Sequence, residues 1–275
     1  MDNKMYISFI GGGNMARAMI GGLKKNNVDM TTITVIDPDL EKCQQLAKEF
    51  KVKITDQYVE NNQSPLNQVI VLAVKPQQMK AVCAQLSPHI STQLIISIAA
   101  GIRLGDISRW LGNYAAIVRV MPNTPAQIQA GVSALFAMPE VNQAQKNLAS
   151  FILSSVGMTL WLDDEVKMDA VTAISGSGPA YVFYLIEALQ DAAISLGLTT
   201  EESSMLALQT FAGASLLASQ STTDIQTLRA QVTSKGGTTE QGLLALEAAD
   251  IKKIMLAAAK AAADKSKSLG DHLAQ

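Results

Sequence analysis

"FIGGGNMARAM", residues 9–19, is the stretch that decides the fold. It carries Gly11, Gly13 and Ala16 in the pattern G-x-G-x-x-A, directly after an apolar run and at the start of a segment with helical spacing. The first glycine permits a tight turn, the second lets the backbone approach a pyrophosphate, and the small third residue permits close packing of the helix. The phosphates would lie at the positive end of that helix. We therefore predict a dinucleotide-binding turn; the alternative is a glycine turn that binds no ligand.

The order of strand, turn and helix is repeated up to about residue 161. Strands that are apolar on both faces and are separated by helices indicate a parallel sheet covered on both sides. The predicted fold class is therefore α/β, with an amino-terminal doubly wound Rossmann-type parallel sheet domain over residues 1–162. Strands are expected at 5–10, 32–36, 68–74, 93–99 and 115–120, with less regular ones at 131–137 and 158–162, and helices at 14–26, 39–50, 77–86 and 139–156.

The character of the chain changes after Leu162, where β-branched runs give way to Ala, Leu, Met, Glu and Gln at helical spacing. This pattern predicts an all-α domain over residues 163–275, with helices at 180–196, 200–219 and 250–270. Thr199 and Glu202 have the form of a capping box at the start of the second of these helices. Ala-rich faces that pack closely need a partner helix, so we expect a homodimer through this half.

The composition narrows the class of partner. The formal net charge is −2 and no dense run of Lys or Arg occurs, which argues against a nucleic-acid or membrane partner and favours small molecules. Cys43 and Cys83 lie in expected helices, so free buried thiols are favoured over a disulfide. The apolar run at 5–10 is too short for a signal peptide, and no stretch reaches 18 apolar residues. We expect a cytoplasmic protein.

Asp37, at the end of the second predicted strand, is a candidate for binding the adenosine ribose. Its carboxylate would accept hydrogen bonds from the ribose hydroxyls of NAD and would repel the ribose phosphate of NADP. Alternatively, "DPD" (37–39) is only a turn between strand and helix, in which Asp37 or Asp39 caps the helix.

Three more strand ends offer candidate cofactor residues, because ligands bind at the carboxyl edge of such sheets. In "AVKP" (73–76), we expect Lys75 to face the cofactor; the alternative is a solvated lysine in a turn. In "SIAAG" (97–101), small residues let the nicotinamide ribose approach or serve close helix packing. Asn123 in "MPNTPA" (121–126) bonds the nicotinamide or the substrate, or is an ordinary turn residue. The expected cofactor residues are Ile10, Gly11, Gly12, Gly13, Asn14, Met15, Ala16, Asp37, Ala73, Val74, Lys75, Pro76, Ala99, Ala100, Gly101 and Asn123.

A second glycine cluster, "TSKGGTTEQ" (233–241), interrupts the helical half. Thr238 and Gln241 have the spacing of a capping box, so the glycines would lie just before a helix. The exposed amides of a helix start bind an anion without a cationic side chain. The turn would suit a substrate carboxylate, with hydroxyls from Ser234, Thr238 and Thr239. The alternative is a well-capped helix with no ligand.

The motifs together resemble the pyrroline-5-carboxylate reductase family. They are "FIGGGNMA" (9–16), "AVKP" (73–76), "SIAAG" (97–101), "MPNTPA" (121–126), "SGSGPAY" (175–181) and "VTSKGGTTEQGL" (232–243). The resemblance implies hydride transfer from NAD(P)H to the imine of 1-pyrroline-5-carboxylate, giving L-proline. It also implies that Ser234, Gly237 and Thr238 bind the substrate carboxylate and that Thr239 bonds the ring nitrogen as the catalytic residue. It further implies a homodimer, with five such dimers forming a decamer.

Some features depart from the family pattern. Lys235 stands where proline is usual, and "SQSTTDIQTLR" (219–229) replaces the acidic residue and His-Pro pair common upstream of the loop. His89 and His272, the only histidines, are expected to be structural or solvated. Hydride transfer to an imine requires neither a metal nor a nucleophile, because the cofactor carries the hydride. Alternative functions are a β-hydroxyacid-type dehydrogenase and a non-catalytic NAD(P)H-sensing module.

Overall fold

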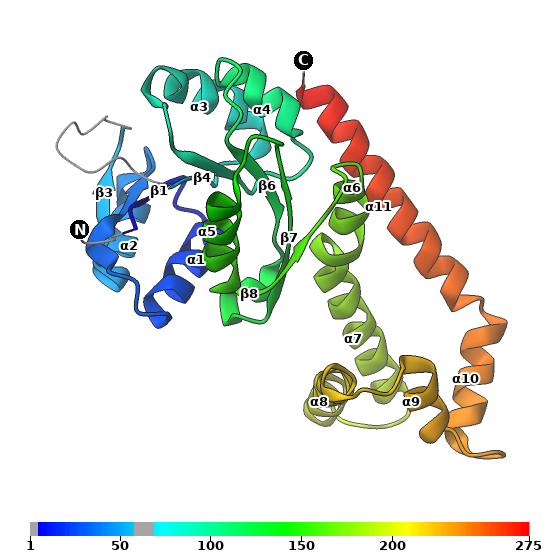
Figure 1. Ribbon diagram of the computed structural model, residues 1–275. Coiled ribbons are helices and arrows are strands. Elements are labelled where there is room, and N and C mark those ends of the chain that lie inside the picture. Colours follow the sequence, from blue (N-terminus) through cyan, green and yellow to red (C-terminus); the bar gives the residue numbers. More distant parts are fainter. Residues whose placement is uncertain (1–4, 58–68, 275) are drawn as a thin grey trace. The chain divides into compact units, whose positions relative to one another are not determined.

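The computed structural model of the chain describes residues 5–57 and 69–274 (Figure 1). The chain forms two compact units, of which one comprises residues 1–177 together with 262–275, and the other comprises residues 178–261. The composition changes at residue 162, just after the last strand, whereas packing continues in the first unit up to Ser177 and includes the end of the last helix. The predicted boundary at residue 162 differs from the boundary of the compact units, because the prediction follows residue types whereas the units follow contacts between residues.

The first unit is built on an eight-stranded sheet with the order β3-β2-β1-β4-β5-β6-β7-β8. Its strands are β1 (Ile7–Ile10), β2 (Ile33–Ile36), β3 (Lys53–Thr55), β4 (Val69–Leu72), β5 (Leu94–Ser97), β6 (Ile117–Met121), β7 (Gly131–Ala137) and β8 (Gly157–Trp161). All neighbours pair in parallel except β6 and β7, which are antiparallel. The chain turns to opposite sides of β1, which pairs with β2 and β4, so the ligand-binding crevice of a doubly wound sheet is expected at the carboxyl end of β1.

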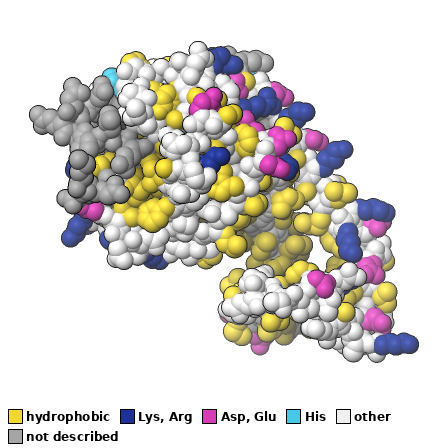
Figure 2. Space-filling view, viewed as in Figure 1, with side chains coloured by type: hydrophobic (Ala, Val, Ile, Leu, Met, Phe, Trp, Pro, Cys, Tyr) yellow, Lys and Arg dark blue, Asp and Glu magenta, His cyan; other side chains and the backbone are white. Residues whose placement is uncertain are grey.

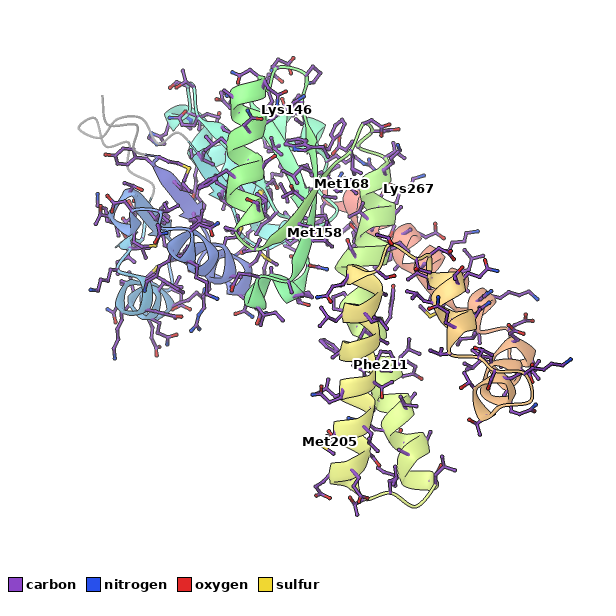
Figure 3. All side chains as sticks on the ribbon, turned by 60° about the horizontal axis from the view of Figure 1, so that its bottom comes forward. Lys146, Met158, Met168, Met205, Phe211 and Lys267 are labelled. Carbon is purple, nitrogen blue, oxygen red and sulfur yellow. The ribbon has the colours of Figure 1, made fainter. Side chains whose placement is uncertain are left out.

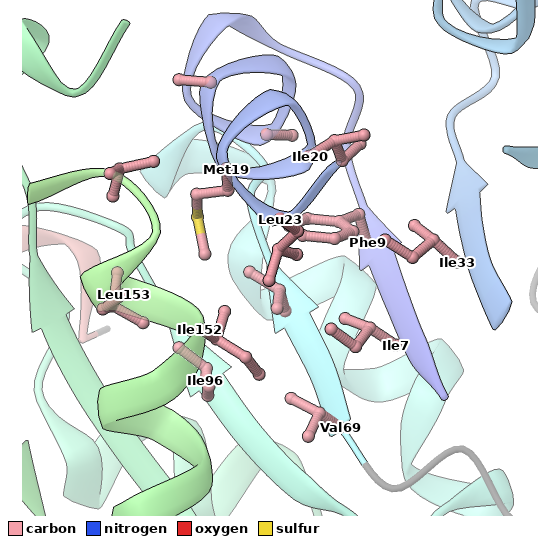
Figure 4. Close-up of a cluster of buried hydrophobic side chains, with 14 of the residues drawn as sticks. Ile7, Phe9, Met19, Ile20, Leu23, Ile33, Val69, Ile96, Ile152 and Leu153 are labelled. Carbon is pink, nitrogen blue, oxygen red and sulfur yellow. The ribbon is translucent and has the colours of Figure 1, made fainter. Parts of the chain in front are cut away.

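Helices cover both faces of the sheet (Figure 1). They are α1 (Asn14–Lys25), α2 (Leu40–Phe50), α3 (Met79–Leu86), α4 (Leu104–Trp110) and α5 (Gln143–Ser154). Successive strand residues contribute to two separate apolar clusters: Val69 and Val71 join one, and Ile70 and Leu72 join the other. Figure 4 shows the first cluster, which includes Phe9 of β1, Leu23 of α1 and Ile152 of α5. The central strands are therefore buried on both faces, as their apolar sequences predicted, and the α/β fold class is confirmed.

Several short elements were not predicted from the sequence, and they include one strand and two helices of the two units. These three are β3, α4 and the helix α9 (Ile225–Gln231). β3 has three residues and α4 and α9 have seven each, which is too few to establish a hydrophobic period. The predicted capping box of Thr199 and Glu202 is confirmed, because the Thr199 hydroxyl accepts from Glu202 N at 3.2 Å and the Glu202 carboxylate accepts from Thr199 N at 2.8 Å.

The second unit is all helical and leaves many apolar side chains exposed. Its elements are α7 (Gly178–Ser195), α8 (Thr200–Gln220), α9, α10 (Thr238–Ala248) and the first part of α11 (Ile251–Leu273). No residue of α7, α9 or α10 is buried, and Phe183 on α7 is 66% exposed. Figure 2 shows hydrophobic side chains on the surface of this unit, and Figure 3 labels the exposed Met205 on α8. Apolar surface of this extent is typical of an interaction site.

A short α6 (Lys167–Val171) and a π-helical turn (Thr172–Gly176) connect the sheet to the second unit. None of the described helices is both long enough and apolar enough to cross a membrane.

Candidate active site

The turn after β1 has the geometry that its glycines predict. Gly11 has a φ of +101° and donates its amide hydrogen to Ile36 O at 2.8 Å. A Cβ atom on Gly11 would lie only 2.6 Å from Ala73 O, so the neighbouring strand end permits no side chain here. Ala16 is fully buried, which matches the need for a small third residue where the helix packs closely.

The helix that follows opens with free donors. Gly13 is the N-cap of α1 and no side chain caps this end. The first-turn amides of Asn14, Met15 and Ala16 have no acceptor within the helix, because helix geometry provides none. A Cβ atom on Gly13 would find no heavy atom within 4 Å, so the space beside these donors is open. The predicted context of strand, turn and helix is confirmed, and the arrangement suits a pyrophosphate.

A cavity of about 860 Å³ lies beside this turn, at the carboxyl ends of β1, β2 and β4. Its volume is within the range of sites for nucleotide-sized ligands. It is lined by Ile10, Gly11, Ile36, Asp37, Pro38, Asp39, Lys42, Asp56, Gln57, Val74, Lys75, Gln78, Val82, Gln85, Leu86 and His89. His89, which was expected to be structural or solvated, also lines this cavity.

Asp37 is buried, with 8% of its surface exposed, and its carboxylate is already bonded within the protein. Oδ2 accepts from Gly12 N at 2.8 Å and from Lys42 Nζ at 3.0 Å, and Oδ1 accepts from Asp39 N at 3.0 Å. Burial alone raises the pKa of Asp37, but the hydrogen bonds from Gly12, Asp39 and Lys42 outweigh it and hold the pKa below the ordinary value of an aspartate. The carboxylate is thus ionised and fixes the glycine turn to the end of β2.

The alternative interpretation of "DPD" as a capped turn is confirmed for Asp39. Asp39 is the N-cap of α2, and its side chain accepts from Lys42 N at 3.1 Å. A ribose contact of Asp37 stays a prediction.

The turn after β4 contributes Val74 and Lys75 to the cavity. Ala73 N donates to Ile10 O at 2.8 Å, which joins this turn to the glycine turn. Lys75 is exposed, and Pro76 begins a 3-10 turn (Pro76–Gln78). Lys75 is therefore both solvated and at the cavity wall, so the two interpretations of this lysine are compatible.

The loop after β5 is held by the end of the last helix. Gly101 has a φ of +79°, and a Cβ atom on Gly270 would lie 2.5 Å from Gly101 O. Arg103 and Asp271 form an ion pair at 2.6 Å next to this contact. Close helix packing, the alternative given for the small residues at 99–101, is thus confirmed for Gly101, while a ribose contact of Ala99 and Ala100 stays a prediction.

Asn123 has a structural bond. Its Oδ1 atom accepts from Val132 N at 2.9 Å and so ties the loop after β6 to the start of β7. This bond supports the turn interpretation, although the Nδ2 atom can still donate to a ligand.

In the helical unit, the second glycine turn requires glycine at Gly236 and is closely packed at Gly237. Gly236 has a φ of +74°, and a Cβ atom on Gly237 would lie 2.5 Å from Ser234 Oγ. The predicted capping box of Thr238 and Gln241 is wrong: Gly237 is the N-cap, no side chain caps it, and Thr238 is the first helical residue. Glu240 in the first turn of the helix instead accepts from the residue before the N-cap, since its Oε2 atom accepts from Gly236 N at 2.7 Å.

The start of α10 still offers donors to an anion. Gly237 N donates to Ser234 O at 3.0 Å, so this amide is used within the turn and its predicted role as a carboxylate donor requires that bond to be released. The amides of Thr238, Thr239 and Glu240 have no acceptor within the helix. The side chains of Ser234, Thr238 and Thr239 are exposed. The donors and hydroxyls suit a small carboxylate.

Comparisons with known proteins identify both halves of the chain. Residues 165–269 match the family described as "Pyrroline-5-carboxylate reductase dimerisation", and residues 6–101 match "NADP oxidoreductase coenzyme F420-dependent". A pyrroline-5-carboxylate reductase from Pseudomonas aeruginosa is 45% identical over 272 residues, which cover 98% of each chain.

Solved structures agree with this result. A pyrroline-5-carboxylate reductase from Coxiella burnetii superposes with a TM-score of 0.90 at 42% identity and covers 97% of this chain and 99% of its own. A Plasmodium falciparum pyrroline carboxylate reductase with NADP bound has a TM-score of 0.84 at 32% identity, covering 98% of this chain and 99% of its own. The chain thus matches these relatives over nearly its whole length in both sequence and fold, and it belongs to the pyrroline-5-carboxylate reductase family.

Proposed function

We propose that this protein reduces the imine of 1-pyrroline-5-carboxylate to L-proline with NADPH or NADH, the last step of proline biosynthesis. The observation that carries the proposal is the pair of glycine turns, each placed directly before a helix whose first amides are free. One turn suits a pyrophosphate and the other suits a carboxylate. The relatives that match over nearly the whole chain have the same activity in their names.

The residues present fit a nicotinamide dinucleotide. The amides of Asn14, Met15 and Ala16 would bind its pyrophosphate, and the cavity beside Asp37 and Val74 would hold its adenosine part. When bound, the cofactor supplies the hydride. Ala99, Ala100, Gly101 and Asn123 remain the proposed neighbours of the nicotinamide half.

The turn before α10 would hold the substrate. Its carboxylate would accept from the amides at the helix start and from Ser234 and Thr238, with Gly237 as the predicted further donor. The Thr239 hydroxyl would bond the ring nitrogen, orient the ring and assist with its proton. Reduction adds a hydride to the imine carbon and a proton to the nitrogen, so the main task of the protein is to place the two rings together. The two turns belong to different compact units, so the working enzyme must bring them together within a subunit or between subunits.

The proposed assembly is a homodimer through the helical half, and five such dimers would form a decamer. The dimerisation region at 165–269 and the exposed apolar side chains of α7 and α8 support the dimer. The proposed location is the cytoplasm.

The assay that tests the function follows both directions of the reaction with purified protein. Imine-dependent oxidation of NADPH and NADH and, at high pH, proline-dependent reduction of NADP and NAD are expected. Failure in both directions with both cofactors would refute the assignment. β-Hydroxy acids serve as the comparison substrates, and turnover of those alone would favour the β-hydroxyacid-type dehydrogenase.

A further inference from the structure

The carboxylate of Asp37 presents a problem for cofactor choice. An acidic residue at the end of β2 ordinarily binds the ribose hydroxyls of NAD and repels the 2′-phosphate of NADP. In this protein, Oδ2 of Asp37 already accepts from Gly12 N and Lys42 Nζ, and Oδ1 accepts from Asp39 N. A carboxylate has about four acceptor positions, so roughly one remains for a ribose that offers two hydroxyls. The usual two-bond recognition of NAD is therefore incomplete while Lys42 is in place.

Lys42 also changes the charge of this wall of the cavity. Its ammonium lies 3.0 Å from Oδ2 of Asp37 and 3.6 Å from Oδ2 of Asp39. The hydrogen bond with Asp37 raises the pKa of the Lys42 ammonium, which is thus protonated at neutral pH. An ammonium has three donors, and 39% of this side chain is exposed, so at least one donor can turn toward a ligand. The buried negative charge of Asp37 is neutralised at the point where a phosphate would meet it.

The position of Lys42 fits this role. Lys42 lines the 860 Å³ cavity and also the smaller hollow bounded by Gly12, Gly13 and Asn14. A ribose that links the adenine to the pyrophosphate passes between these two places. The other charged groups on the cavity wall are Asp39, Asp56 and Lys75, with His89 nearby. Asp39 and Asp56 are exposed, so solvent and salt screen their repulsion of a phosphate more than that of a buried carboxylate.

We propose that Lys42 is the residue that lets the adenosine site accept the 2′-phosphate of NADPH in spite of Asp37. The inference rests on the proposed dinucleotide site and names the group that decides between its two cofactors. Lys42 binds the phosphate and shields Asp37, and the protein accepts NADPH at least as well as NADH.

Binding to the protein without substrate tests the inference independently of turnover. NADPH and NADH are titrated separately and followed by nucleotide fluorescence, with the natural protein, Lys42→Met, Lys42→Arg and a control, Lys48→Met. Lys48 is an exposed lysine on the same helix and lines neither hollow. Lys42→Met should weaken NADPH binding about ten- to a hundredfold, the value of a charged hydrogen bond, and should change NADH binding less than about threefold. Lys42→Arg should restore most of the NADPH affinity, and Lys48→Met should match the natural protein.

The outcomes separate the inference from the proposed function. Equal losses for NADPH and NADH in Lys42→Met, at an unchanged melting temperature, would mean that Lys42 only holds the turn, and the inference would be wrong. An unchanged NADPH affinity would also overturn it. If the natural protein bound neither nucleotide, the dinucleotide site itself would fail. A further expected sign is a smaller salt dependence of NADPH binding in Lys42→Met, because one phosphate contact is lost.

Discussion

The two glycine turns of this protein are both held by a hydrogen bond from a backbone amide to a carboxylate, but one bond is buried and the other is exposed. In each turn a carboxylate accepts a hydrogen bond from a backbone amide: Asp37 from Gly12 N at 2.8 Å, and Glu240 from Gly236 N at 2.7 Å. Asp37 and Gly12 are buried, whereas Gly236 is exposed and Glu240 is half-buried. The first turn is thus fixed by the sheet of its own unit. The second is fixed only by local bonds, so it can respond to a substrate or to a second subunit.

Gly11→Ala should have the largest effect, because it breaks the turn that is fixed by burial. The new Cβ would lie 2.6 Å from Ala73 O in a backbone with a φ of +101°, and neither can move without disturbing β1 and β4. We expect a loss of about 2–5 kcal/mol in the free energy of unfolding and no measurable cofactor binding. Denaturant unfolding and nucleotide titration measure the two effects.

Gly13→Ala is the matched control on the same turn. Its Cβ would meet no heavy atom of the protein, and Gly13 has an ordinary φ of −73°. Stability should stay within about 1 kcal/mol, while cofactor binding weakens because the Cβ projects toward the pyrophosphate. If Gly11→Ala were as stable as Gly13→Ala, the claim that β4 closes on this turn would be wrong.

Thr239→Val tests whether the exposed turn carries the chemistry. The side chain is exposed, so the fold should not change. Loss of the hydroxyl that orients the ring nitrogen should lower kcat about a hundredfold, with a smaller change in the KM for the imine. Thr239→Ser keeps the hydroxyl and should retain most of the rate. Unchanged turnover in Thr239→Val would remove the proposed role of Thr239.

Most of the fold of the sheet unit could be predicted from the sequence, because its local sequence patterns agree with how the strands and helices pack. Apolar strands such as 69–72 are buried on both faces, and the glycine turn lies between a strand and a helix as its spacing requires. The helical half was harder. Its helices were recognised, but their apolar side chains are exposed in one chain, and sequence alone does not tell which of them a second copy covers.

The candidate site was predicted less completely, because several of its polar groups have partners that are distant in sequence. The bond from Gly12 N to Asp37 could be expected from the fold, yet the bond from Val132 N to Asn123 depends on how β7 meets β6. The packing of Gly270 on Gly101 joins residues 169 positions apart, and no local sequence pattern predicts it. At the second turn, the error over the capping box was one residue, since Gly237 and not Thr238 has the extended backbone of an N-cap.

Asp37→Asn measures how much the buried hydrogen bonds of the Asp37 carboxylate contribute to the free energy of unfolding. The pKa of Asp37 is lowered in the folded protein, so its ionised form is more favourable there than in the unfolded chain. That contribution is present above the unfolded pKa and is lost as the pH falls through the lower folded pKa. We expect Asp37→Asn to be about 1–3 kcal/mol less stable at pH 7, where one charged acceptor with three donors is replaced by an amide. The difference between the two proteins should shrink in unfolding curves measured at successively lower pH. A constant difference would mean that charge is not the cause.

Glu240→Ala should have a smaller effect on stability than Asp37→Asn, because the same kind of bond is made here in solvent. Water can replace the lost acceptor of Gly236 N, so the free energy of unfolding should change by less than about 1 kcal/mol. The turn would nevertheless lose the contact that holds Gly236 at a φ of +74°, and the KM for the imine should rise severalfold while kcat changes less. Glu240→Gln keeps an oxygen acceptor and should restore the KM. If Glu240→Ala destabilised the protein as much as Asp37→Asn, the second turn would be buried in the assembled enzyme. The contrast between a buried and an exposed carboxylate–amide bond would then apply only to the isolated chain.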